Sequence, residues 1–282
     1  MFHRAKSTKY LSTLSFIAAC LTFIVIGLGA FTRLSNAGLG CPDWPGCYGH
    51  LIASQQSAAQ PINLYKAQVE MVHRYFAGTL GAFVIVIALL CAITSRYFLS
   101  ISLFALIVYQ VLLGMWTVTL KLSPAIVMQH LLAGMTILSL LWLIYLNTRS
   151  RVIENVNTAF TKTFRTFALF GLILLFLQIV LGAWTSSHYA GLLYDGLSAA
   201  HRWGGVIVGC VLFSLFLSIQ IQYQTHLHLR KISWYLLFFL GVQICLGLIN
   251  ILFQLPLWIA IAHNLTAATL LLIMVTINYL LV

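Results

Sequence analysis

The sequence predicts an all-α polytopic membrane protein, and three observations on its 282 residues support this fold class. Apolar residues make up 61% of the chain, while charged residues make up only 7% against roughly 25% in a soluble domain. The mean hydropathy is +0.99. The apolar residues form continuous runs, without the alternation of a membrane β-barrel. This composition excludes a soluble enzyme and a disordered chain.

Eight charge-free runs are long enough for the roughly 20-residue helices that cross a bilayer. The first run follows three basic residues, as a signal peptide does. It has no small-x-small cleavage site before a soluble domain, and its last residues, 29–32, nearly recur at 182–185. We therefore expect it to remain as the first of eight transmembrane helices. The runs are 10–32, 75–95, 97–120, 122–148, 166 up to Asp195, 203–225, 232–255 and 256–282.

The net charge of +11 is distributed unequally between the two sets of connections. Ten basic residues lie on one side and five on the other, which places both termini in the cytoplasm and the loop 33–65 outside. The basic residues are too scattered for a nucleic-acid-binding face, so we expect no nucleic-acid partner. The larger set is Arg4, Lys6, Lys9, Arg96, Arg149, Arg151, Lys162, Arg165, Arg230 and Lys231, and the smaller is Arg33, Lys66, Arg74, Lys121 and Arg202.

The two halves of the chain, 1–148 and 149–282, resemble each other in sequence. An even number of helices in each half gives both halves the same orientation, so we predict two parallel four-helix repeats. The matched segments are 29–32 with 182–185, 37–39 with 190–192, His73-Arg74 with His201-Arg202, 109–114 with 242–247, and His130 with His263.

Four histidines lie at repeat-matched places early in the even-numbered helices, namely His73, His130, His201 and His263. Ionisable residues inside a membrane are costly and mark functional sites by default. Two imidazoles that meet across a helix bundle are ligands for the iron of a b-type heme. The four histidines therefore predict one heme pocket in each half, near the outer surface. Hydrogen bonding of each imidazole to a neighbouring carbonyl, and zinc binding, are the alternatives.

Arg74 and Arg202 directly follow two of these histidines. An arginine at the membrane surface suits a bidentate carboxylate, and heme carries two propionates. We expect both arginines to bind propionates; the alternative is that they only extend their charge to the interface.

The first half carries groups that the second half lacks. Glu70 lies three residues before His73 on the same helix face, whereas its counterpart in the second half is Ser198. Cys41 and Cys47 lie in the first outer loop, where an oxidising compartment permits a disulfide. We expect Glu70 to exchange protons, because a partly apolar site makes a carboxylate easier to protonate, and we expect the cysteines to form a redox-active pair above the first heme pocket, so that both are candidate catalytic groups. The alternatives are a structural ion pair of Glu70 with Arg74 and a purely structural disulfide. The asymmetry predicts that the first half binds the heme that reacts and the second half a permanent electron-transfer heme.

These residues together resemble the heme A synthase family over nearly the whole chain. The matching pieces are Gly29-Ala30-Phe31-Thr32-Arg33-Leu34 running into Ala37-Gly38-Leu39, then Cys41-Pro42-Asp43-Trp44-Pro45, Glu70-Met71-Val72-His73-Arg74, His130, His201-Arg202 and His263-Asn264.

The resemblance implies oxidation of a methyl group of heme O to a formyl group, through an alcohol, to give heme A for terminal oxidases. It implies that His201 and His263 ligate a heme b cofactor and that His73 and His130 face the substrate heme. Glu70 matches the family's essential acid, and Cys41 and Cys47 match its first cysteine pair. Some bacterial members have a second pair in the second half; this chain lacks it.

The resemblance also implies a bacterial plasma-membrane location and partners among heme O synthase and oxidase assembly factors. The electron partner and self-association stay open. The rival functions are a quinone-linked diheme b-type electron carrier, which needs the histidines but neither Glu70 nor the cysteines, and a transporter. No proline interrupts a span, since Pro124 and Pro256 lie at helix starts, and this disfavours a transporter.

Overall fold

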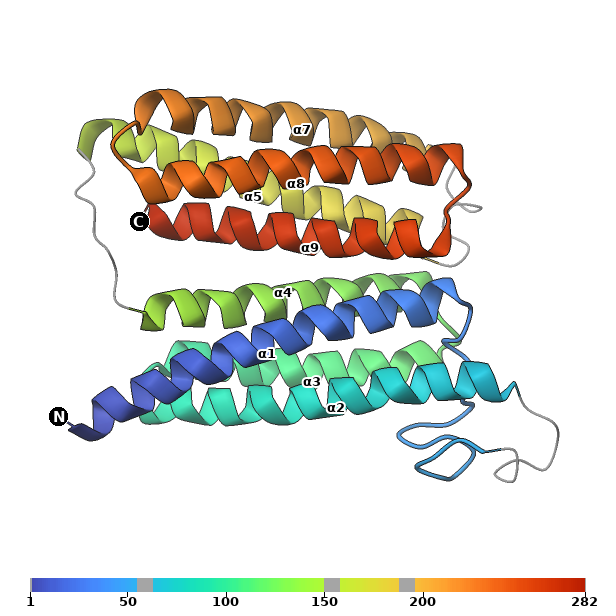
Figure 1. Ribbon diagram of the computed structural model, residues 1–282. Coiled ribbons are helices and arrows are strands. Elements are labelled where there is room, and N and C mark those ends of the chain that lie inside the picture. Colours follow the sequence, from blue (N-terminus) through green and yellow to red (C-terminus); the bar gives the residue numbers. More distant parts are fainter. Residues whose placement is uncertain (1, 55–62, 150–157, 188–195, 282) are drawn as a thin grey trace. The chain divides into compact units, whose positions relative to one another are not determined.

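The computed structural model describes residues 2–54, 63–149, 158–187 and 196–281 (Figure 1). In this part of the chain, eight helices are long and apolar enough to cross a membrane. The prediction of an all-α integral membrane protein is thereby confirmed. The helices are α1 (Phe2–Leu34), α2 (Leu64–Ile93), α3 (Tyr97–Thr119), α4 (Pro124–Thr148), α5 (Thr158–Thr185), α7 (Leu197–Gln222), α8 (Leu227–Leu252) and α9 (Leu257–Leu280).

The chain divides into two compact units, the first built from α1 to α4 and the second from α5, α7, α8 and α9. In the first unit, α1 and α3 each pack against both α2 and α4. The helices α2 and α4 therefore lie diagonally across a four-helix ring. Its core includes the fully buried side chains of Leu103 and Leu113 on α3 and of Leu138 and Leu141 on α4.

The second unit has the same order of neighbours. Both α5 and α8 pack against α7 and α9, so that α7 and α9 are the diagonal pair. Leu212 and Leu215 of α7 and Met274 of α9 fill its core. Asn278 donates a 3.2 Å hydrogen bond to the carbonyl of Ala168, which ties the end of α9 to α5. The parallel repeat and the cytoplasmic termini stay predictions, and the repeat segment 190–192 lies outside the described residues.

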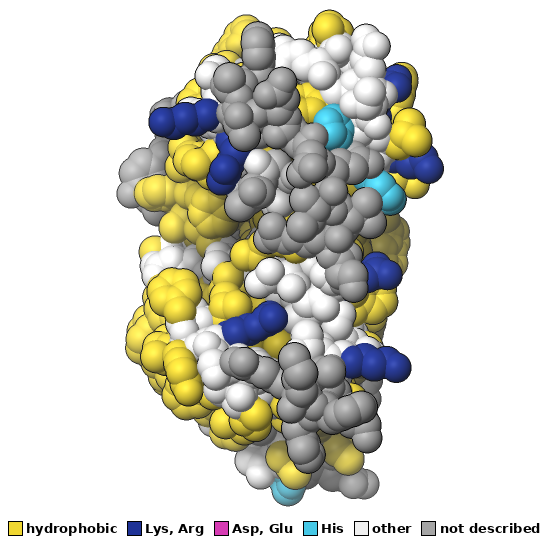
Figure 2. All heavy atoms as spheres, turned by 90° about the vertical axis from the view of Figure 1, so that its left-hand side faces the viewer, with side chains coloured by type: hydrophobic (Ala, Val, Ile, Leu, Met, Phe, Trp, Pro, Cys, Tyr) yellow, Lys and Arg dark blue, Asp and Glu magenta, His cyan; other side chains and the backbone are white. Residues whose placement is uncertain are grey.

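The surfaces of the helices are strongly apolar. Phe98 on α3 and Trp258 on α9 are 82% and 70% exposed. Such exposure is stable where the surrounding medium is lipid. The face in Figure 2 shows apolar side chains interspersed with Lys and Arg, and no described side chain in view is Asp or Glu.

Several helices begin before the predicted charge-free runs, and two of the differing boundaries bear on the site. The helix α2 begins at Leu64, not at residue 75, and the Asn63 side chain caps it by accepting a hydrogen bond from the N–H of Lys66. The prediction stopped at charged residues, but Glu70 and Arg74 lie inside the helix and neutralise each other. Likewise, α5 ends at Thr185, ahead of the predicted limit at Asp195, which is outside the described residues. His73 thus lies well inside α2.

Candidate functional site

The four predicted histidines lie on the diagonal helices of the two units. In the first unit, His73 is on α2 and His130 on α4; in the second, His201 is on α7 and His263 on α9. The two histidines of each unit therefore lie on helices that face each other diagonally across one four-helix ring. The structure places each predicted pair inside a single unit.

Each imidazole packs against a glycine on the preceding helix. A Cβ atom at these glycines would lie 2.8–3.3 Å from the Cε1 atom of the ring, which is closer than side chains normally approach. The absence of a side chain therefore lets each ring lie against the backbone of the neighbouring helix. The pairs are Gly29 with His73, Gly114 with His130, Gly182 with His201, and Gly247 with His263.

Two of the histidines are also held by glutamine amides. Gln178 on α5 places its Nε2 atom 3.0 Å from Nδ1 of His201 and donates a 2.6 Å hydrogen bond to the carbonyl of that residue. Gln243 on α8 places its Nε2 atom 3.2 Å from Nε2 of His263. In the first unit, the amide of Gln110 on α3 lies beside Gly134, one turn beyond His130. Glutamine therefore fixes the imidazoles of the second unit directly.

The paired imidazoles fit the axial ligands of a heme. The Nδ1 atoms of His73, His130 and His263 are buried and have no hydrogen-bond partner among the described residues. Buried polar atoms are rarely left without a partner, so these rings have unused ligand capacity. No three His, Cys, Asp or Glu side chains of the described chain gather as ligands for a bare metal ion. Two opposed imidazoles suit an iron that a porphyrin already holds.

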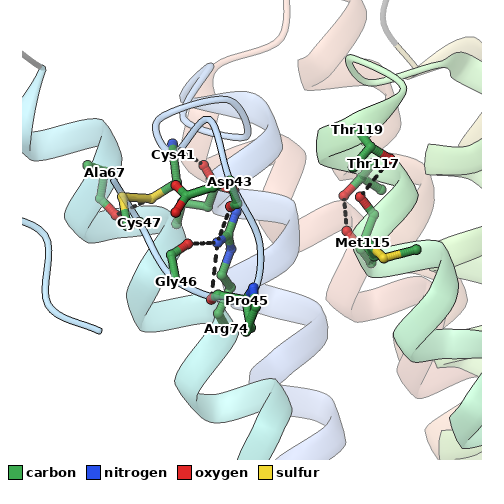
Figure 3. A network of polar contacts seen from close by, with 12 residues as sticks. Cys41, Asp43, Pro45, Gly46, Cys47, Ala67, Arg74, Met115, Thr117 and Thr119 are labelled. Atoms are coloured by element: carbon green, nitrogen blue, oxygen red, sulfur yellow. Dashed lines mark hydrogen bonds and ion pairs between the residues drawn. A yellow bond between two sulfur atoms is a disulfide. The ribbon is translucent and has the colours of Figure 1, made fainter. Parts of the chain in front are cut away.

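Glu70 and Arg74 form the centre of a polar network on α2. The Nη2 atom of Arg74 donates to Oε1 of Glu70 at 2.5 Å. Its Nη1 atom donates to the carbonyls of Asp43 at 2.9 Å, Gly46 at 2.5 Å and Pro45 at 3.3 Å. Figure 3 shows the guanidinium inserted into the first outer loop. Arg74 is thus already engaged, and its role as a propionate partner stays a prediction.

The first outer loop is closed by a disulfide between Cys41 and Cys47, as the sequence predicted (Figure 3). Both cysteines are fully buried and pack with Ala67 and Met71 of α2. The backbone N–H of Cys41 donates a 2.9 Å hydrogen bond to Oε2 of Glu70. The disulfide-closed loop and Arg74 therefore hold the two oxygens of the buried carboxylate from opposite sides. Residues 55–62 of the predicted loop 33–65 lie outside the described chain.

Asp43 stabilises the tip of this loop. Its carboxylate accepts hydrogen bonds from the N–H groups of Tyr48 at 2.6 Å and Gly49 at 2.8 Å. Partial burial opposes ionisation of Asp43, but the N–H groups of Gly49, Tyr48 and Asp43 itself, together with Arg74, hold its pKa below the usual value. The carboxylate is therefore ionised at neutral pH and anchors the loop over α2.

Arg202 has different surroundings from Arg74. It is exposed, and it donates to the carbonyl of Ser198 at 3.2 Å and approaches Oγ of Ser198 at 3.4 Å. Ser198 occupies the position that Glu70 has in the first half. No described acidic residue forms an ion pair with Arg202, so its guanidinium retains donors for a carboxylate.

Sequence reasoning missed the glycines and glutamines that contact the histidines. The signal is a glutamine four residues before the glycine, which occurs as Gln110–Gly114, Gln178–Gly182 and Gln243–Gly247. Residues four apart share a helix face, so one face presents both an amide and a space for an imidazole. It also missed Arg33, whose buried Nε atom has no hydrogen-bond partner among the described residues.

Comparison with known proteins connects this geometry to a family. The sequence model of the cytochrome oxidase assembly protein family matches residues 12–199 and 195–275. The chain is 40% identical to the heme A synthase of Shewanella oneidensis over 93% of this chain and 94% of that protein. It is 26% identical to the heme A synthase of the Wolbachia endosymbiont of Brugia malayi, over 92% of this chain and 93% of that protein.

The match extends to more distant bacterial relatives. The heme A synthase of Rickettsia prowazekii is 24% identical, over 97% of each chain. Similarity along almost the entire length shows that the chain belongs to the cytochrome oxidase assembly protein family, among the heme A synthases.

Proposed function

We infer that this integral membrane protein is an oxidoreductase that converts heme O to heme A for the assembly of terminal oxidases. The observation that carries this function is the 40% identity to a heme A synthase over 93% of the chain. The chain also carries the paired histidines, the acid and the cysteine pair through which its sequence resembles this family. The substrate is hydrophobic, which agrees with a site among membrane-spanning helices.

The two units are assigned different hemes. His201 and His263 would ligate a resident heme b, and Arg202, which has no acidic partner among the described residues, would bind one of its propionates. His73 and His130 would face heme O in the first unit. Support for this assignment comes from Glu70 and the disulfide-closed loop, both of which belong to the first unit. The heme b supplies the capacity to carry electrons away from the oxidised substrate.

Glu70 is proposed to handle protons at the substrate carbon. Where electrons leave the substrate and water supplies the oxygen atom, oxidation of the methyl group to the alcohol releases two electrons and two protons, and oxidation of the alcohol to the formyl group releases two more of each. Each oxygen of Glu70 accepts one hydrogen bond, from Arg74 or from the N–H of Cys41, and keeps a second lone pair. The carboxylate is thus fixed in place yet able to take up a proton at Oε1 or Oε2. Its burial, at 4% exposure, limits competition from water.

The location and partners follow from the same chemistry. We expect a bacterial plasma membrane with both pockets toward its outer side, because the disulfide needs an oxidising compartment. A heme O synthase would supply the substrate and oxidase assembly factors would receive the product. An electron acceptor must regenerate the heme b.

A heme analysis tests the function. The chain is expressed together with a heme O synthase in a host without heme A, and hemes extracted from the membranes are separated and identified by mass. Heme A is expected. Accumulation of heme O alone, with the protein folded and carrying heme, would overturn the assignment and favour a diheme electron carrier.

A further inference from the structure

We propose that Gln178 and Gln243 position the imidazoles that hold the resident heme, and that Val25 makes His73 the exchangeable ligand of the substrate pocket. This inference rests on the proposed function, because it concerns why one heme stays bound while the other must enter and leave. It assigns positioning roles to residues outside the expected heme-ligand and proton-handling groups.

In the second unit, each of the two glutamines directly contacts one of the two histidines. Gln178 reaches both the Nδ1 atom and the backbone carbonyl of His201, at 3.0 and 2.6 Å. Gln243 reaches a ring nitrogen of His263 at 3.2 Å. Each imidazole is thereby restrained in orientation from the neighbouring helix.

The two glutamines occupy equivalent positions relative to the glycines on which the imidazoles pack. Gln178 and Gln243 each precede, by one helical turn, the glycine on which the imidazole packs. In the first unit Gln110 has the same relation to Gly114. The corresponding residue before Gly29 is Val25, which is the counterpart of Gln178 at the offset of 153 that relates 29 to 182.

Val25 cannot form a hydrogen bond with the imidazole of His73. Its side chain has no hydrogen-bonding atom, and Nδ1 of His73 has no partner among the described residues. Outer-sphere hydrogen bonds to a ligating histidine fix its orientation and raise its basicity, and their loss weakens metal binding by about 10- to 100-fold. The Nδ1 atoms of His130 and His263 are also without a partner in the described part of the chain, but only His73 packs on a glycine that is preceded by a residue without a hydrogen-bonding side chain. His73 therefore lacks a positioning amide, in the pocket that must release its product.

The Oε1 atoms of the two glutamines are further hydrogen-bond acceptors near the histidines. Those of Gln178 and Gln243 are buried and have no hydrogen-bond partner in the described part of the chain. An imidazole that binds iron through one nitrogen carries a proton on the other, which needs an acceptor. In this structure the amide nitrogen faces the ring; an amide turned by 180° would present Oε1 to that proton, whereas a leucine or valine has no acceptor atom.

A set of variants in the second unit tests the positioning role. Gln178→Leu and Gln243→Leu should retain about 10- to 100-fold less resident heme b through purification. Gln178→Glu and Gln243→Glu should keep the heme but lower its reduction midpoint, because a carboxylate makes the imidazole a stronger donor to ferric iron. Unchanged heme content in both Leu variants and unchanged midpoints in both Glu variants would overturn the proposal.

A reciprocal exchange tests the role of Val25. Val25→Gln should slow the transfer of heme from the first unit to an excess of apomyoglobin by about 10-fold, with Val25→Leu as the matched control. Gln178→Val should make the resident heme exchangeable even if Val25→Gln fails to fold. The proposal is overturned if Gln178→Val leaves the exchange rate of the resident heme unchanged.

The outcomes separate this inference from the proposed function. If the unmodified chain forms heme A but neither exchange alters heme transfer, the glutamine proposal is wrong and the enzyme assignment stands. If the exchanges alter transfer as expected but the unmodified chain forms no heme A, the ligand-positioning claim stands and the assignment of the reaction is wrong.

Discussion

At the scale of single residues, Glu70 has two functions that substitution can separate. It pairs with Arg74 and accepts the N–H of Cys41, so it is both a structural acceptor and the proposed proton acceptor. Glu70→Gln keeps an acceptor oxygen but removes the carboxylate, and Arg74 keeps three loop carbonyls as partners. We expect normal heme b content and at least a roughly 100-fold loss of heme A formation, which is the lower end of the range for general acid–base groups.

The heme spectrum and the extracted hemes are the measurements for Glu70. Glu70→Ala should lose activity equally but also loosen the loop. Full activity in both variants would show that Glu70 does not handle protons and has only a structural role, in its ion pair with Arg74.

The glycines at the histidines give a second prediction at this scale. Alanine at a helix position is normally more favourable than glycine by about 1 kcal/mol. At Gly182, however, the new Cβ would lie 2.8 Å from Cε1 of His201, so the imidazole must move. We expect Gly182→Ala to lose most of the resident heme b while the protein remains folded.

A matched control is available for that substitution. Gly241 also lies in a helix of the second unit, and nothing lies within 4 Å of a Cβ built there. Gly241→Ala should retain normal heme content, measured as heme absorbance per protein after purification. Equal heme content in the two variants would contradict the packing argument.

At the scale of elements, the first outer loop and α2 act as one assembly. The disulfide closes a ring whose carbonyls bind Arg74 and whose Cys41 N–H binds Glu70. Closing a ring of this size stabilises the chain by about 2–3 kcal/mol in the entropy model. The double variant Cys41→Ser, Cys47→Ser should therefore melt at a lower temperature and form less heme A.

Chemical reduction of the disulfide in the unmodified protein provides a comparison for the double variant. The unmodified protein under a strong reductant should show the same lowered melting temperature as the double variant, which itself should not respond to reductant. Cys210→Ser replaces a free cysteine of α7 and keeps the disulfide, so it should melt like the unmodified protein with and without reductant. If the double variant matches the unmodified protein in both stability and product, the disulfide does not position Glu70.

The same elements show why helix boundaries were harder to predict than helices. Continuous apolar runs predicted eight spans, because length and hydropathy decide membrane insertion. The start of α2 was misplaced because a charge-free rule excludes Lys66, Glu70 and Arg74, although a cap at Asn63 and an i,i+4 ion pair allow them in the helix. These compensations depend on neighbours that a hydropathy window does not consider.

At the scale of the whole molecule, the internal repeat made the candidate site residues predictable from the sequence. Matched offsets selected His73, His130, His201 and His263, and the break at Ser198 selected Glu70. The engagement of Arg74 by loop carbonyls could not be predicted, because its partners lie 28–31 residues away in an irregular loop. Contacts of this kind depend on tertiary structure and leave no periodic signal.

Each unit is a closed ring of four helices with its own core, so the two pockets should fail independently. If His201 and His263 hold a resident heme b as proposed, His201→Ala and His263→Ala should each abolish its low-spin spectrum, since each would remove one ligand of the iron. His73→Ala and His130→Ala should leave that spectrum intact and abolish heme A formation, because the ligand that they remove belongs to the substrate pocket. Absorption spectra of the purified variants and their extracted hemes provide both measurements.

Loss of the resident spectrum in the His73 and His130 variants, with its retention in the other two, would reverse the assignment of the units. Equal loss in all four would show that the two pockets do not form separately, and the asymmetry at Glu70 and Ser198 would then have to act within one shared site.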